Sequence, residues 1–160
     1  MLEDIVLDTN VFVYSGNRTS PEFKSSISLL RKLYTKTTQL CVDEGFSLDK
    51  NKNSSRIGYE YIQHIKPIFY AYNVLESLLR SKRIKFLPKN APNKSKAGKF
   101  IQQKISNRGD RAFAGVTYNS SEKYLVSYDF EDFPIWLRKE IRKKGIGIRI
   151  ILPSTASSKL

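Results

Sequence analysis

The sequence predicts an α/β domain built on a mainly parallel sheet. Short apolar runs alternate along the chain with longer segments whose apolar residues recur at helical spacing. Parallel strands need crossover connections, usually helices, so this alternation favours a parallel sheet. The 160 residues suffice for one domain with a substantial core, and no internal repeat is present. We therefore expect a single domain over residues 1–153.

Five short runs are expected to form the strands. Most are continuous apolar stretches, which is typical of strands buried on both faces of a sheet. The last one alternates Ile with Gly and Arg, as a half-buried strand does. In chain order the runs are Ile5–Leu7, Gln39–Val42, Ile84–Leu87, Tyr124–Ser127 and Ile146–Ile151.

Helices are expected between these strands, because apolar residues recur there every three or four positions. The chain should first turn away from the sheet over Asn10–Ser15. The first expected helix begins near Pro21. The others cover Arg56–Ile65, which ends before Pro67, Ile68–Leu79, Arg111–Tyr118, which follows Asp110, and Pro134–Lys144, which ends before Gly145.

Three polar segments are expected to lack regular structure. Residues 43–55 are rich in turn-forming residues and predict a loop or hairpin. Residues 88–99 contain several lysines and no large apolar residue before position 100, which predicts a mobile basic loop. Residues 154–160 are expected to form a short C-terminal tail.

The composition points to a polyanionic partner. The chain carries 28 Lys and Arg against 15 Asp and Glu, a net charge of +13. Such a charge opposes compactness through self-repulsion and attracts polyanions, so nucleic acid is the leading partner. An acidic protein or a membrane surface is the alternative.

Several other classes are disfavoured. No run approaches the roughly 20 apolar residues of a membrane span, so we expect no integral membrane protein. The opening MLEDIVLDTN has acidic residues where a signal peptide has basic ones, so a cytoplasmic location is expected. A lone cysteine, Cys41, excludes an internal disulfide and a cysteine-based zinc site.

Aspartates follow two of the predicted strands. Asp8 comes directly after Ile5–Leu7, and Asp129 comes just after Tyr124–Ser127. Functional groups of open α/β sheets gather at the carboxyl ends of the strands, so these two side chains are expected to lie close together. Asp110 precedes a helix of small residues, where the helix dipole favours its negative charge.

Clustered carboxylates favour a bound cation. Two of them about 5 Å apart repel by roughly 3 kcal/mol at an effective dielectric constant of about 20. Such a cluster either raises its pKa values or binds a metal, and oxygen ligands suit Mg²⁺ or Mn²⁺. Taken singly, Asp8 and Asp110 also fit as helix caps and Asp129 as a turn residue.

Three segments resemble motifs of PIN domains. IVLDTN at 5–10 is similar to their opening motif, and NRGD at 107–110 to their third acidic motif. LVSYDFEDF at 125–133 resembles the fourth, in which a strand is followed by Ser or Thr, aspartates and Phe. Glu60 stands where the second acidic residue belongs. Order and approximate spacing agree across most of the chain.

The resemblance implies a three-layer α/β/α sandwich with a central sheet of about four or five strands. It implies an endoribonuclease that hydrolyses RNA with a water activated by Mg²⁺ or Mn²⁺. Homodimers are frequent in the family, and many small members are toxins whose partner is a small antitoxin protein. The catalytic and metal-holding residues carried over are Asp8, Glu60, Asp110 and Asp129, and Asp132 would share or replace the role of Asp129.

Glu60 has competitors for the second acidic position. The polar stretch before it is longer than in the compact toxins, and other acidic residues are available. These alternatives are Asp43, Glu44, Asp49 and Glu76.

Neutral and basic residues complete the predicted site. Thr9, Asn10 and Ser127 lie beside the proposed ligands and are expected either to orient them or to serve as plain turn residues. Basic residues near Asp110 are expected to contact RNA phosphates, the alternative being a solvated surface: Lys89, Lys94, Lys96, Lys99, Arg108 and Arg111.

Other functions fit less well. A phosphatase of the haloacid dehalogenase type needs an aspartate two residues after the first, where this chain has Asn10. DNA flap nucleases use similar carboxylates but are normally larger. The alternative from another class is a non-catalytic RNA-binding or scaffold domain that retains the PIN fold.

Overall fold

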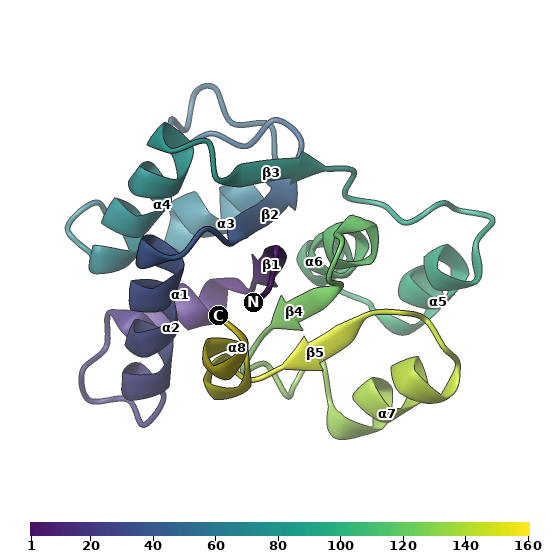
Figure 1. The fold of residues 1–160 in the computed structure, drawn as a ribbon. Helices are drawn as coiled ribbons and strands as arrows, with labels where there is room; N and C mark the ends of the chain where they lie inside the picture. The colour runs from purple at the N-terminus through teal and green to yellow at the C-terminus, as the bar shows by residue number, and fades with distance from the viewer.

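A computed structural model describes residues 1–160 as a five-stranded sheet covered by helices on both faces (Figure 1). The strand order is β3-β2-β1-β4-β5, and every neighbouring pair is parallel. The strands are β1 (Asp4–Leu7), β2 (Gln39–Asp43), β3 (Ile84–Leu87), β4 (Tyr124–Val126) and β5 (Arg149–Ile151). The predicted three-layer α/β/α fold with a mainly parallel sheet is confirmed.

Eight helices form the two outer layers. They are α1 (Thr9–Ser15), α2 (Phe23–Thr35), α3 (Arg56–His64), α4 (Tyr70–Arg80), α5 (Lys96–Lys104), α6 (Arg108–Asn119), α7 (Ile135–Lys143) and α8 (Pro153–Lys159). On one side α2 packs against α1, α4 and α8. On the other, α6 packs on β1, β2 and β4 and is flanked by α3 and α5 (Figure 1). No helix has both the length and the apolar character needed to cross a membrane.

The position of β1 explains why its sequence is so apolar. It pairs with β2 on one side and with β4 on the other, and all four of its residues are buried. Leu7 is in register with Val126, so the residues that follow both strands emerge at the same edge of the sheet. The chain turns at Asp8 directly into α1, as its extended backbone conformation allows.

Side chains fix the starts of α3 and α6. Ser55 caps α3 by accepting a hydrogen bond from the Gly58 N–H at 2.7 Å. Asn107 caps α6 through its Oδ1, which accepts the Gly109 N–H at 2.7 Å. Ser and Asn are strongly preferred at this position because they satisfy free N–H groups of the first turn. These caps set where Glu60 and Asp110, each within the helix that follows, meet the sheet edge.

The sequence predicted a loop over residues 88–99, but only the first part of this segment lacks regular structure. Their second half begins α5, with Ser95 accepting a hydrogen bond from the Gly98 N–H at 2.9 Å. The first half is held by Asn119, whose Nδ2 donates to the carbonyl groups of Pro88 at 2.8 Å and Asn90 at 3.0 Å. The helical pattern of α5 is weak in the sequence, because its buried face consists of Ala97, Gly98, Phe100 and Ile101, of which only Phe100 and Ile101 are large.

Residues 154–160 also differ from the expected tail, because residues 154–159 belong to α8 and Leu160 caps its end. Pro153 occupies the first turn of this helix, where its missing N–H costs nothing. Ala156 and Leu160 join the core, and Lys32 on α2 donates to the Ser157 carbonyl at 2.6 Å. Small polar residues such as those of α8 carry a weak helical pattern, so packing against α2 decides its structure.

The last strand is shorter than the predicted range Ile146–Ile151. Ile146 and Ile148 are buried, but the strand itself covers only Arg149–Ile151. Gly145 and Gly147 have φ angles of +61° and +91°, a left-handed conformation that strands do not adopt. Residues 44–55 form turns without regular strands or helices, as expected.

Candidate metal centre

Acidic residues from four segments line one cavity at the carboxyl edge of the sheet. The cavity measures about 340 Å³ and lies where β1 and β4 end and where α3 and α6 approach them. Its acidic lining residues are Asp8, Glu60, Asp110, Asp129 and Asp132. The structure thus brings together all five carboxylates singled out from the sequence.

Asp8 is held at the end of β1 by three hydrogen bonds. Its N–H donates to the Val126 carbonyl at 2.9 Å, and its Oδ2 accepts the Ser127 hydroxyl at 2.6 Å and the Asn10 amide at 2.9 Å. The side chain is 6% exposed. Burial raises the pKa of Asp8 to about 6; the Ser127 hydrogen bond opposes this shift, and the nearby Asp129 charge adds to it.

Asp110 is the least satisfied carboxylate of the cavity. It lies in the first turn of α6, is buried, and its Oδ2 has no hydrogen-bond partner. Burial raises the pKa of Asp110 to about 8, and the charges of Asp132, Asp8 and Asp129 raise it further in that direction. A buried carboxylate oxygen without a hydrogen-bond partner destabilises the folded state, so a cation bound at this oxygen would be stabilising.

Asp129 and Asp132 lie in the turn after β4. The Oδ1 of Asp129 accepts the backbone N–H groups of Glu131 and Asp132, both at 2.8 Å, which leaves its other oxygen free for the cavity. Asp110, Asp129 and Asp132 each place one carboxylate oxygen within 4.8 Å of those of the other two. Three carboxylates so close repel strongly unless protons or a cation compensate them.

Glu60 faces the same cavity from α3, at its rim. Its Oε1 forms an ion pair with Arg56 at 3.0 Å, and its Oε2 is 4.0 Å from His64 Nε2. A Cβ atom added to Gly109 would lie 3.2 Å from Glu60 Oε1, so α3 and α6 approach each other closely at this point. Glu60 therefore belongs to the cavity but lies outside the three-carboxylate group.

The four alternatives to Glu60 do not line the cavity. Asp43 caps α3, because it accepts the N–H groups of Arg56 at 2.7 Å and Ile57 at 2.9 Å and the Ser55 hydroxyl. Glu76 pairs with Arg80 at 3.8 Å on α4. Glu44 and Asp49 lie in the exposed loop after β2, where Asp49 pairs with Lys52 at 3.5 Å.

Two of the three neutral residues predicted beside the ligands, Ser127 and Asn10, support Asp8 or Asp129 with their side chains. Ser127 is fully buried; it donates to Asp8 and accepts the Asp129 N–H at 2.8 Å. Asn10 donates to Asp8 and accepts the Tyr128 N–H at 3.2 Å. The Thr9 hydroxyl is buried at the cavity without a hydrogen-bond partner.

The predicted basic residues divide into two groups. Lys89, Arg108 and Arg111 line a second cavity, which lies on the other side of the first turn of α6. Lys94, Lys96 and Lys99 are exposed and line neither cavity.

Three residues of the centre were not singled out from the sequence. Asn107 caps α6 and lines the acidic cavity, Arg56 pairs with Glu60, and Arg138 donates to the Asp129 carbonyl at 2.7 Å. Asn before Arg-Gly-Asp was a readable capping signal. Arg56 four residues before Glu60 was a readable helical ion pair. The Arg138 contact depends on how α7 folds back, for which no local signal exists.

The donor set of this cavity fits a hard divalent cation. It offers carboxylate oxygens and no thiolate, and one of its buried oxygens lacks any other partner. Asp110, Asp129 and Asp132 could hold such a cation, with Asp8 beside them in the same cavity.

Comparison of the chain with protein-family models, with curated proteins and with solved structures gives no match.

Proposed function

We propose that this protein is a metal-dependent endoribonuclease of the PIN type, which hydrolyses RNA phosphodiester bonds at the acidic cavity. The observation that carries the proposal is the group of Asp110, Asp129 and Asp132, whose carboxylate oxygens lie within 4.8 Å of one another. The unpartnered Asp110 Oδ2 favours a cation in this group.

Some residues of the cavity would bind the cation, and others would position a water molecule. Asp110, Asp129 and Asp132 would bind Mg²⁺ or Mn²⁺. When bound, such an ion lowers the pKa of water and stabilises negative charge on phosphate oxygens. Asp8, fixed by Ser127 and Asn10, presents its second oxygen to the cavity and would orient the water and accept its proton.

Glu60 would complete the set from the opposite wall. Its ion pair with Arg56 holds the side chain at the cavity. The net charge of +13 supports a polyanionic substrate, because the acidic cavity is a local exception on a basic chain.

Cleavage of a mixed RNA pool in Mn²⁺ tests the proposal. The wild type is compared with the double variant Asp8→Asn, Asp129→Asn, and with Glu44→Gln as a matched control. Glu44 is an exposed carboxylate outside the cavity, so its loss should leave cleavage unchanged. We expect cleavage by the wild type and the control, a loss of at least about 100-fold in the double variant, and none in EDTA.

Cleavage that survives in EDTA or in the double variant would exclude this centre. RNA binding by the wild type without cleavage of any RNA in the pool would favour the non-catalytic scaffold.

A further inference from the structure

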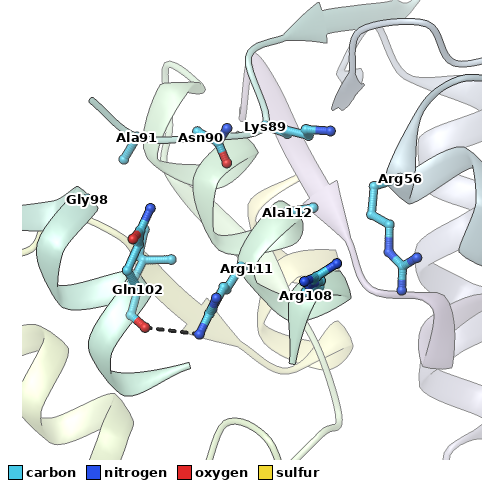
Figure 2. A pocket seen from close by; sticks show the side chains of 10 residues that line it. Arg56, Lys89, Asn90, Ala91, Gly98, Gln102, Arg108, Arg111 and Ala112 are labelled. Atoms are coloured by element: carbon cyan, nitrogen blue, oxygen red, sulfur yellow. Dashed lines mark hydrogen bonds between the residues drawn. The ribbon is translucent and has the colours of Figure 1, made fainter. Parts of the chain in front are cut away.

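A second cavity lies beside the acidic one and is basic. It measures about 360 Å³ and is lined by residues of α3, α5, α6 and the segment before α5. Figure 2 shows its side chains gathered around α6, with Gly98 and Gln102 of α5 on one side and Arg56 of α3 on the other. Its charged lining residues are Arg56, Lys89, Arg108 and Arg111, and no carboxylate lines it.

Most of this positive charge is uncompensated. Arg111 uses its Nε and Nη2 on the carbonyl groups of Ile105 at 2.5 Å and Gln102 at 3.0 Å, which fixes the side chain without neutralising it. Lys89 and Arg108 have no ion-pair or hydrogen-bond partner and are exposed. Only Arg56 is paired, with Glu60, and its Nε is buried without a partner. Like charges kept together in one cavity favour an anionic ligand.

The wall that carries Lys89 is built rigidly. A Cβ atom at Gly115 would lie 1.9 Å from the Lys89 carbonyl oxygen, and one at Gly98 would lie 2.2 Å from the Pro92 carbonyl oxygen. The backbone of residues 88–92 therefore rests directly on α6 and α5, and only glycine permits this approach. Together with the hydrogen bonds from Asn119, this packing fixes the cavity before any ligand binds.

The two cavities are neighbours. Arg108 lines the basic one and Gly109 and Asp110 line the acidic one, so they share the first turn of α6. The Arg56–Glu60 ion pair links them across α3, because Arg56 lines one and Glu60 lines the other. The two cavities therefore lie next to each other at the start of α6.

We propose that the basic cavity is a phosphate-binding subsite for a nucleotide of the RNA strand next to the one that is cleaved. Lys89, Arg108 and the free nitrogen of Arg111 bind the phosphate, and the Asn90 and Gln102 amides contact the nucleoside. The inference rests on the proposed function for the identity of the strand, but the cavity itself does not depend on catalysis.

Binding of a labelled single-stranded RNA hexamer in EDTA tests the subsite without any cleavage. The full-length variant Lys89→Gln, Arg108→Gln is compared with the matched variant Lys36→Gln, Arg80→Gln. The matched pair removes the same charge from exposed positions at the ends of α2 and α4, outside this cavity. Neither pair makes hydrogen bonds through these side chains to other elements, so both variants should fold.

We expect the Lys89, Arg108 variant to bind RNA at least about tenfold more weakly than the matched variant. The slope of log affinity against log salt should become shallower by roughly 0.7, because the contact with one phosphate is lost. Adenosine 5′-monophosphate should displace the hexamer from the wild type, whereas adenosine should not.

Equal weakening by the two double variants would mean that only overall charge matters, and it would overturn the subsite. Displacement by adenosine as strong as that by the monophosphate would equally overturn a phosphate site. Absence of cleavage in Mn²⁺ together with the expected binding pattern would remove the nuclease proposal alone. Cleavage without the binding pattern would remove the subsite alone.

Discussion

Asp4 and Asp110 are both buried aspartates, but their surroundings give the two carboxylates opposite properties. Burial opposes ionisation of Asp4, yet hydrogen bonds from Lys85 and from the N–H groups of Glu122 and Ser121 lower its pKa overall. Asp110 has a buried oxygen without a partner and three carboxylates nearby, so its pKa is raised to about 8. Asp4 is thus built to stabilise the fold, whereas Asp110 opposes folding at neutral pH.

Substitution Asp110→Asn should stabilise the metal-free protein increasingly as pH rises. An unfolded aspartate loses its proton near pH 3.8, whereas folded Asp110 keeps its proton to about pH 8. Between these values the folded state binds more protons, so the stability of the wild type falls with rising pH. Urea unfolding in EDTA at pH 5 and pH 8.5 measures the difference, and a variant without any gain at pH 8.5 would contradict it.

Asp4→Asn serves as the opposite control in the same experiment. Because the pKa of Asp4 is lowered, its contribution is present above its unfolded pKa and is lost only at acid pH. This variant should be less stable than the wild type at both pH values. A gain in stability from Asp4→Asn would mean that the hydrogen bonds from Lys85, Ser121 and Glu122 do not hold an ionised carboxylate.

At the scale of elements, α3 depends on a carboxylate that lies outside it. Asp43 ends β2 and accepts hydrogen bonds from Arg56, Ile57 and Ser55 at the start of the helix. Tyr61, one turn further along, is fully buried and donates to the Leu7 carbonyl at 2.5 Å, just before Asp8. Asp43 therefore positions Glu60 and the end of β1 through the helix.

Asp43→Ala should destabilise the fold by about 3 kcal/mol or more, because two N–H groups and a hydroxyl lose a charged acceptor in a buried place. Ser55→Ala, which removes the cap and one of the three hydrogen bonds to Asp43 but keeps the Asp43 acceptor for the two N–H groups, should cost less, about 1 kcal/mol. Urea unfolding of the two variants gives the comparison. Equal losses would show that Asp43 does not organise the start of α3.

Elements differ in how far the sequence predicts them. The three inner strands were readable because a strand buried on both faces must be continuously apolar, as Ile5–Leu7 is. By contrast, α5 and α8 were missed, since small residues such as Ala97 and Ala156 carry little pattern. Those helices form because Gly98 and Ala156 let them pack closely on the segment before α5 and on α2.

For the whole molecule, a parallel sheet explains which parts of the centre were predictable. Asp8 and Asp129 could be placed together because both follow strands, and strand ends meet at one edge. Glu60 was placed only through a family resemblance, because nothing in a helix indicates which sheet edge it faces. Lys89, Arg108 and Arg111 were expected to contact phosphates, but the cavity that they line was not predictable. It depends on the contact of Lys89 with Gly115, 26 residues further along the chain.

Mn²⁺ should raise the thermal stability of the whole molecule at pH 8. A cation at 100 times its dissociation constant stabilises the folded state by about 2.7 kcal/mol, or roughly 5–10 °C in Tm for a chain of this size. Differential scanning fluorimetry measures the shift. Asp110→Asn should lose most of it and Glu44→Gln none, and an equal shift in all three proteins would place the cation elsewhere.

The central place of β1 has a consequence for the order in which the molecule can assemble. Val6 pairs with Leu125, a contact across most of the chain, and Asp8 meets Ser127 only once that contact exists. Contacts so distant in sequence form late, because a long loop must close before they contribute. In a chain made from its N-terminus, the five carboxylates of the cavity can therefore come together only once residue 132, in the last third of the chain, has been made.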